Sequence, residues 1–416
     1  MQKRFLLTNF RFLAVLSVVA VVVKVVLSGS SVVSYDFLYL LRELMHGWRQ
    51  SPVPYVQISG PFYDLWRALP FDHPDLTGLI AGDLSSIEPR IYALALMIKM
   101  PVLVADLICA YLVKSIVVQG WGKQYGMLAA TCWLLNPYVL ITGEMTGSVE
   151  LIPIAVTLAA TLLMMKDRVG FASLALGVAT ALKLFPIILS PPLVLCYLKL
   201  KRRRQSMEIA ISVVVGFVLY LFWVEAFGVK FGFSLLNYTP FTMVASELIL
   251  TPYASRIGLA TISALVFCSI LSLYWKVRTQ NLFDVLLAYM LAYMAFYDWR
   301  PQNLLWLVPF ITVDMIVSGK RAKFFFVILM VSAFILSLMM FEFATGHSAF
   351  FIPAVTEELR ILSEILRMIQ RDNVMVFAVS PIPRSIFSGV ALVYCFHVIA
   401  RNSPRLVQLI RGTDSN

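Results

Sequence analysis

Residues 91–117 read IYALALMIKMPVLVADLICAYLVKSIV, an apolar stretch long enough to cross a membrane as a helix. About 20 such residues span the roughly 30 Å hydrocarbon core, where every backbone polar group has to be satisfied within the segment. Its hydrophobicity is continuous and does not alternate as in a membrane β-barrel strand. Lys99 and Asp106 interrupt it, and such charges are costly in lipid unless they are paired or face water.

Comparable stretches recur along the chain, which is 60% hydrophobic and 14% charged with a mean hydropathy of +0.83. Soluble domains have about 25% charged residues. The sequence therefore predicts an all-α, polytopic membrane protein forming one domain over residues 1–416, with large outer loops at 30–90 and 342–385. The predicted helices number about twelve: 11–29 (an uncleaved span), 91–117, 125–143, 148–165, 169–184, 186–199, 209–227, 257–275, 281–297, 302–318, 323–341 and 386–400.

The short connectors alternate in charge, and this alternation predicts the topology. Basic clusters such as 199–204 and 320–323 fall on one parity, and the acidic first loop falls on the other. The positive-inside rule then predicts that both termini are cytoplasmic and that the functional site is extracellular or luminal. The net charge of +11 is scattered over these connectors, so we expect a lipid bilayer as partner and no nucleic acid.

Two outer segments have the apolar period of short amphipathic helices. Residues 34–48 place Leu40, Leu41 and Leu44 on one face, and residues 357–371 show a similar stripe. Both are too short to span and are predicted to lie in the membrane interface. Asp36 falls in the first turn of 34–48, where the helix dipole favours an anion.

Several ionisable residues within or beside the spans are candidates for chemistry, each with a structural alternative. Lys99 and Asp106 share a helix face about 10 Å apart, and either balance charge between helices or face a cavity. Lys183 precedes Pro186 at a broken helix end, where it either binds an anion such as phosphate or snorkels to the interface. Glu144 and Glu150 flank a polar turn that either contacts a glycan or is simply solvated.

Residues 298–303 read DWRPQN and combine a carboxylate, a guanidinium, an indole and two amides. Such a set can bind sugar hydroxyls and a phosphate, with Arg300 suited to bidentate contact. The alternative is an interfacial aromatic belt in which Asp298 pairs with Arg300. His73 in the DHPD sequence at 72–75 resembles a metal-ligand set, but a chance grouping explains it better. No P-loop, GxSxG or HExxH motif is present in the sequence.

The order of these motifs resembles the GT-C superfamily of polytopic glycosyltransferases, and within it the GPI-mannosyltransferase catalytic subunit and prokaryotic polyprenyl-phosphate-mannose transferases. The matching positions are Asp36 after the first span, Lys99 and Pro101 followed by Asp106, Asn136 and Pro137 before the 143–150 turn, Lys183 and Pro186, and Gln302, Trp306 and Pro309. The GPI enzyme has a DxD-like motif, whereas here Leu38 stands two residues after Asp36.

The resemblance implies an inverting hexosyltransferase that moves a sugar, expected to be mannose, from a polyprenyl- or dolichyl-phosphate carrier to an acceptor hydroxyl of a glycan or glycolipid. Asp36 would act as general base. Lys183, Arg300 and Lys99 would bind the donor phosphate as charge develops on it. The expected sugar- or acceptor-binding residues are Glu144, Glu150, Asp298, Gln302 and Trp306. We expect no cofactor and no metal, and a multi-pass transporter or lipid flippase is the alternative function.

Overall fold

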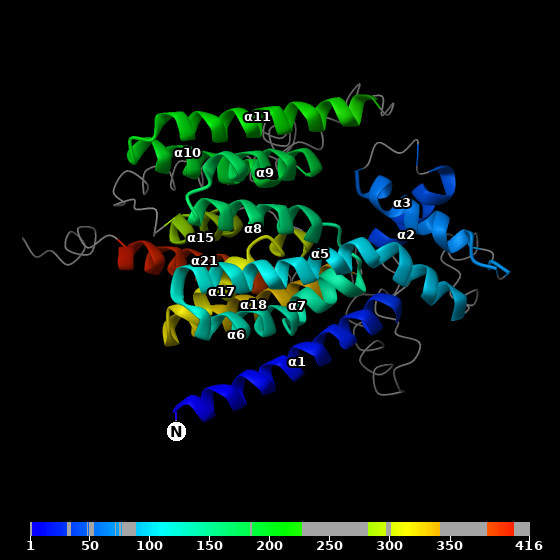
Figure 1. The fold of residues 1–416 in the computed structure, drawn as a ribbon, viewed down its shortest axis with the longest axis horizontal. Coiled ribbons are helices and arrows are strands. Elements are labelled where there is room, and N and C mark those ends of the chain that lie inside the picture. The colour runs from blue at the N-terminus through cyan, green and yellow to red at the C-terminus, as the bar shows by residue number, and fades with distance from the viewer. Residues whose placement is uncertain are drawn as a thin grey trace, which may run out of the picture.

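The computed structural model describes residues 2–30, 35–47, 49, 54–70, 72–74, 76, 89–183, 185–226, 282–296, 301–341 and 381–402. Every regular element in these ranges is a helix, as predicted (Figure 1). The predicted span 257–275, the predicted interfacial helix 357–371, Asp298 and Arg300 lie outside the described residues.

Four helices are long and apolar enough to cross a membrane: α1 (Gln2–Ser30), α5 (Pro89–Trp121), α11 (Arg203–Ala226) and α21 (Pro381–Asn402). A fifth candidate is a bent pair, in which α6 (Lys123–Leu134) meets the segment Pro137–Glu144 at 41°. This segment contains α7 (Pro137–Val139) and the π-helix η3 (Leu140–Met145). The structure confirms a multi-helical membrane architecture in the described residues but does not confirm twelve spans.

The remaining apolar helices are shorter than the predicted spans because the chain breaks them. They are α8 (Leu151–Met165), α9 (Val169–Leu182), the 3-10 turn η4 (Phe185–Leu189) with α10 (Ser190–Lys199), α15 (Leu282–Phe296), and α16 (Pro301–Leu304) with α17 (Val308–Val317). The helix α18 (Lys320–Phe341) corresponds to the predicted span 323–341. Proline explains two of the helix breaks, because it cannot continue a regular helix. Pro137 lies between α6 and η3, and Pro186 lies in η4 between α9 and α10.

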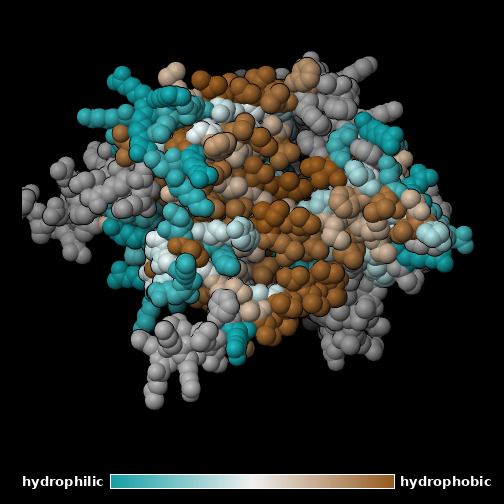
Figure 2. Space-filling view, viewed as in Figure 1, coloured by the Kyte–Doolittle hydropathy of each residue, from teal (hydrophilic) through white to brown (hydrophobic). Residues whose placement is uncertain are grey.

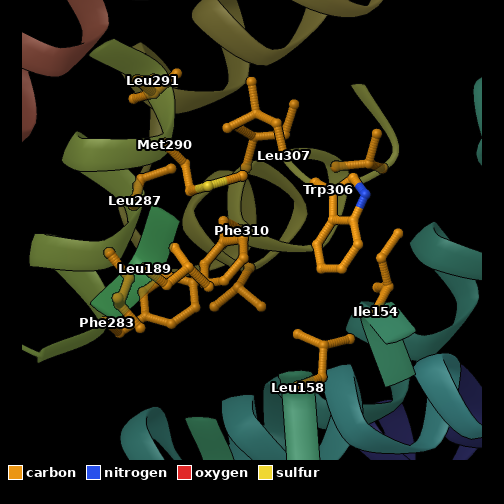
Figure 3. Close-up of a cluster of buried hydrophobic side chains, with 14 of the residues drawn as sticks. Ile154, Leu158, Leu189, Phe283, Leu287, Met290, Leu291, Trp306, Leu307 and Phe310 are labelled. Atoms are coloured by element: carbon orange, nitrogen blue, oxygen red, sulfur yellow. The ribbon is translucent and has the colours of Figure 1, made fainter. Parts of the chain in front are cut away.

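The helices lie side by side in a bundle, with α11 and α9 at one edge and α1 crossing the other edge obliquely (Figure 1). Buried side chains of α5, α8, α15, α17 and α21 form one continuous apolar core. Figure 3 shows part of this core, where Phe310 and Trp306 face Phe283 and Leu158. Figure 2 shows hydrophobic side chains in a broad band between two hydrophilic ends, the distribution expected for a protein in a bilayer.

The predicted helix at 34–48 is confirmed as α2 (Tyr35–Gly47), with Leu40, Leu41 and Leu44 buried. A second short helix, α3 (Pro54–Arg67), packs against α2 and α5 and was not predicted separately within the loop 30–90. These residues form a small apolar cluster of their own, centred on Trp66. We call the end of the bundle where α1 finishes and α2 begins the α2 end.

Candidate functional site

The 140–150 turn consists of η3 and the residues that lead from it into α8, and it lies at the α2 end. Asn136 begins the irregular region, since its side-chain oxygen accepts a hydrogen bond of 2.9 Å from the backbone N–H of Tyr138. Gly147 then adopts a φ of +72°, a conformation that a residue with a side chain rarely takes. The turn places Glu144 and Glu150 in the protein interior, where they are 1% and 2% exposed. The simply solvated turn considered from the sequence is therefore wrong for these two residues.

Glu144 binds α1 through its carboxylate and α5 through its backbone. The hydroxyl of Ser28 donates to Glu144 Oε2 at 2.6 Å, and Lys24 Nζ lies 3.5 Å from Glu144 Oε1. Lys99 Nζ donates to the backbone oxygen of Glu144 at 3.3 Å. The aliphatic stem of Lys99 crosses Gly147 so closely that a Cβ there would lie 3.0 Å from its Cε. Lys99 is 2% exposed, so it does not face an open cavity in the structure.

Asp106 completes this buried group from α5. Its Oδ2 lies 2.7 Å from Lys24 Nζ, and its Oδ1 accepts a 2.7 Å hydrogen bond from the Trp133 indole N–H. Lys24 and Asp106 are fully buried. Together with Lys99 and Glu144 they make a group of two ammonium and two carboxylate side chains, which is formally neutral. Neutrality lets such a group persist in a low-dielectric interior.

Glu150 forms a second buried centre a few residues along the turn. One carboxylate oxygen pairs with the ammonium of Lys183, and the other accepts a 2.8 Å hydrogen bond from the Trp306 indole N–H. Phe185 stacks on Trp306, with ring centroids 4.6 Å apart. Lys183 is 41% exposed at its side chain, whereas Glu150 is nearly fully buried. The Lys183 side chain is thus partly exposed at the point where α9 ends, while its ammonium pairs with the buried carboxylate.

The remaining predicted site residues are only partly described. Asp36 lies in α2, two positions into the helix, but its side chain is outside the described residues. Gln302 is half-buried in α16, four residues before Trp306. The structure thus brings Lys99, Glu144, Glu150, Lys183 and Trp306 to the α2 end of the bundle. Asp36 lies eight residues after Ser28, which contacts Glu144. Even a fully extended chain of this length would place Asp36 no more than about 30 Å from Ser28.

Lys24 is an ionisable candidate within the first predicted span, but it was not among the predicted site residues. Its partners come from α5 and the 140–150 turn, which are far from it in the sequence. The described residues contain no group of three His, Cys, Asp or Glu side chains close enough together to hold a metal ion. The His73 ring packs at a tilt against Trp66, with ring centroids 4.4 Å apart, and its Nε2 lies 2.9 Å from the backbone oxygen of Arg67.

A third charged group lies at the opposite end of the bundle. Arg401 of α21 pairs with Asp284 of α15 and, at 2.8 Å, with Asp314 of α17. Tyr394 also donates to Asp314. This group joins three helices that are far apart in sequence. Asp284 and Asp314 are ionisable candidates within predicted spans, without a predicted role in the reaction.

Comparison with known proteins links the chain to one group of membrane proteins. Residues 79–246 match the family described as "GPI transamidase subunit PIG-U". A curated relative, "GPI mannosyltransferase 1" of Dictyostelium discoideum, is 32% identical over 100 residues, which are 23% of this chain and 22% of the relative. The alignment therefore spans less than a quarter of that relative's length, and no solved structure matches significantly. Both matches belong to the GT-C-like group, so the resemblance stated from the motifs is confirmed.

Proposed function

We propose that this protein is a membrane glycosyltransferase that transfers a sugar, mannose in the first instance, from a polyprenyl- or dolichyl-phosphate to an acceptor hydroxyl at the α2 end. The supporting observation is the concentration of buried charges on the 140–150 turn, within the segment that matches the GPI-pathway family. Ionisable residues at membrane depth are expensive and usually mark functional sites. Likeness to a mannosyltransferase supports the reaction type.

In this proposal the partly exposed Lys183 side chain contacts the donor phosphate. Arg300 joins it from the segment before α16. A positive group placed beside the leaving phosphate stabilises the charge that develops as the glycosidic bond breaks. Lys99 would act on the phosphate only through its charge and not by direct contact, because its ammonium is buried and donates to the backbone oxygen of Glu144.

Asp36 is the proposed general base, which takes the proton from the acceptor hydroxyl as that oxygen attacks the sugar carbon. A single displacement inverts the anomeric centre. The proposed sugar or acceptor side is lined by Asp298, Gln302 and Trp306. Glu144 and Glu150 would hold the 140–150 turn in place beside it. The carrier already activates the sugar, so the reaction needs no nucleotide. A metal ion is not required for the proposed steps.

The decisive experiment is a transfer assay with purified protein and a panel of polyprenyl-phosphate sugars, followed by product analysis. Asp36→Asn should lower kcat at least a hundredfold, the usual size of a general-base contribution. Glu43→Gln is the matched control, because it makes the same charge change seven residues along α2 and should retain turnover. Near-normal turnover of Asp36→Asn would refute the role of Asp36.

The family match supports a second candidate, a non-catalytic subunit of a GPI-transamidase-type complex. The pairing of Lys183 with Glu150 is compatible with this role, since its charge is already balanced without a donor phosphate. Under this alternative, the purified protein transfers no sugar from any donor but co-purifies with other subunits of a membrane complex. The same panel assay, run beside mass spectrometry of the native complex, separates the two candidates.

A further inference from the structure

The helix α1 contacts the rest of the bundle along one narrow stripe. Ala20, Lys24 and Ser28 are each fully buried and are spaced four residues apart, one turn of helix after another. Ser17 continues the stripe with a 2.9 Å hydrogen bond to Thr131 of α6. By contrast Val18, Val22 and Val26 are 57–64% exposed. Among the described side chains of α1, residues 11–28, this valine face is therefore largely exposed and contributes little to fixing the position of α1 along its own axis.

Polar contacts fix the axial position of α1, which its apolar surface does not determine. A valine-rich surface can pack in several axial registers at similar energy, whereas a buried charge or hydroxyl is satisfied in one. Lys24 lies between Asp106 of α5 and Glu144 of the 140–150 turn, at 2.7 and 3.5 Å. Ser28 adds a hydroxyl hydrogen bond to the same Glu144. Sliding α1 by one turn, about 5.4 Å, would leave both carboxylates without these partners.

We propose that Lys24, Asp106 and Ser28 are positioning residues that fix the axial register of α1 and so set where α2, with Asp36, begins. Only four residues, 31–34, separate the end of α1 from the start of α2 in the sequence, so we expect an axial shift of Ser28 to change the position of Asp36. Replacement of a buried ion pair by well-packed neutral groups is often tolerated for stability. The pair therefore serves the geometry of the site rather than the stability of the fold. This inference rests on the proposed function for its catalytic consequence, but the register itself can be measured independently.

The test is the double substitution Lys24→Met with Asp106→Asn. It removes one charge of each sign, leaves Lys99 and Glu144 balanced, and keeps a side-chain oxygen for the Trp133 N–H. The matched control is Arg202→Met with Asp167→Asn, which deletes an ion pair in the turns that join α8 to α9 and α10 to α11. The hydrogen bond from Arg202 to Asp167 raises the pKa of Arg202 above its usual value.

Two measurements are made on each variant. The first is sugar transfer, where the Lys24/Asp106 variant should lose at least tenfold in kcat with little change in donor KM, while the control keeps wild-type values. The second is the spin-label distance between exposed positions Val26 on α1 and Tyr111 on α5, measured after replacing the native cysteines. That distance distribution should broaden or shift by several ångströms in the Lys24/Asp106 variant alone.

Unchanged turnover together with an unchanged distance distribution would overturn the proposal. A shifted distance with wild-type turnover would also overturn it, because the register would then not matter for the site. If the wild-type protein transfers no sugar, the proposed function fails, and the distance measurement still decides the register. Should the double variant not assemble, Ser28→Ala takes its place, since it removes one hydroxyl and little volume. An unchanged distance and unchanged turnover in Ser28→Ala would then refute the positioning role.

Discussion

The closest helix packing in the molecule yields a sharp prediction about stability. On α11, a Cβ added at Gly216 would lie 2.1 Å from the backbone oxygen of Gly177 on α9. A Cβ at Gly177 would lie 2.5 Å from the backbone oxygen of Ser212. Small residues at such crossings let two backbones approach within a membrane, where packing replaces the hydrophobic effect as the cause of association.

The expected cost of Gly216→Ala follows from this geometry. Ordinary contact begins near 3.4 Å, so the methyl group is more than 1 Å too close to a backbone atom that no rotamer change can move. The two helices have to separate along their whole contact. Overpacking costs about 1–3 kcal/mol, and alanine recovers up to about 1 kcal/mol in helix propensity. A net loss of about 1–2 kcal/mol is therefore expected.

Thermal or SDS-induced unfolding in detergent micelles measures this loss. Gly170→Ala is the matched control, because it lies on the same helix as Gly177 and its added Cβ would approach nothing nearer than Glu208 Oε2 at 3.9 Å. The control should be as stable as wild type or slightly more so. Equal stability of Gly216→Ala and Gly170→Ala would refute the close approach of α9 and α11.

Three further predictions concern the charged groups. Gly147→Ala should lower the free energy of unfolding by about 1–2 kcal/mol, because the residue has a positive φ, and should also lower sugar transfer by displacing the Lys99 stem that crosses it. Gly319→Ala is the control, since Gly319 has a φ of +89° and open space around it, and it should lose stability without losing activity. Glu150→Gln should release its lysine partner for anions and tighten inhibition by free polyprenyl phosphate about two- to tenfold, and an unchanged inhibition constant would contradict that pairing. Arg401→Met should destabilise the protein by about 1–3 kcal/mol, because it leaves the buried carboxylate of Asp314 without its cation, and Arg401→Lys should not restore it because a lysine cannot bridge two carboxylates in a fixed fork.

The helices were largely predictable because their cause is local. The apolar stretch at 91–117 became α5, and the period of 34–48 became α2, since composition and spacing determine both. The break near Asn136 and Pro137 also follows from local chemistry, because an N-cap and a proline act within a few residues. The number of spans was harder to predict, since a run of apolar residues does not show where a short helix ends within it.

The partners of the charged residues could not be predicted, because each pair joins elements far apart in sequence. Lys183 and Glu150 were proposed for different roles, one as a phosphate ligand and the other as a sugar contact, and the structure pairs them. Lys24 and Glu144 are 120 residues apart, and only the folding of α1 against α5 and η3 brings them together. Such pairings depend on the tertiary arrangement, which single-sequence periodicity does not specify.

The two ends of the bundle differ in backbone regularity, and this difference supports placing the function at the α2 end. There the described chain contains the π-helix η3, the left-handed Gly147, the 3-10 turn η4 and the short helix α16. Irregular backbone at membrane depth is tolerated where it is buried in protein or lines a water-filled cavity. The opposite end also holds a buried carboxylate, Asp314, but its connectors at Asp167, Lys201 and Gly319 are tight turns between regular helices. Buried charges beside irregular backbone carry a stability cost that a simple connector would avoid. The proposed binding of a polar substrate at the membrane surface would account for both features together.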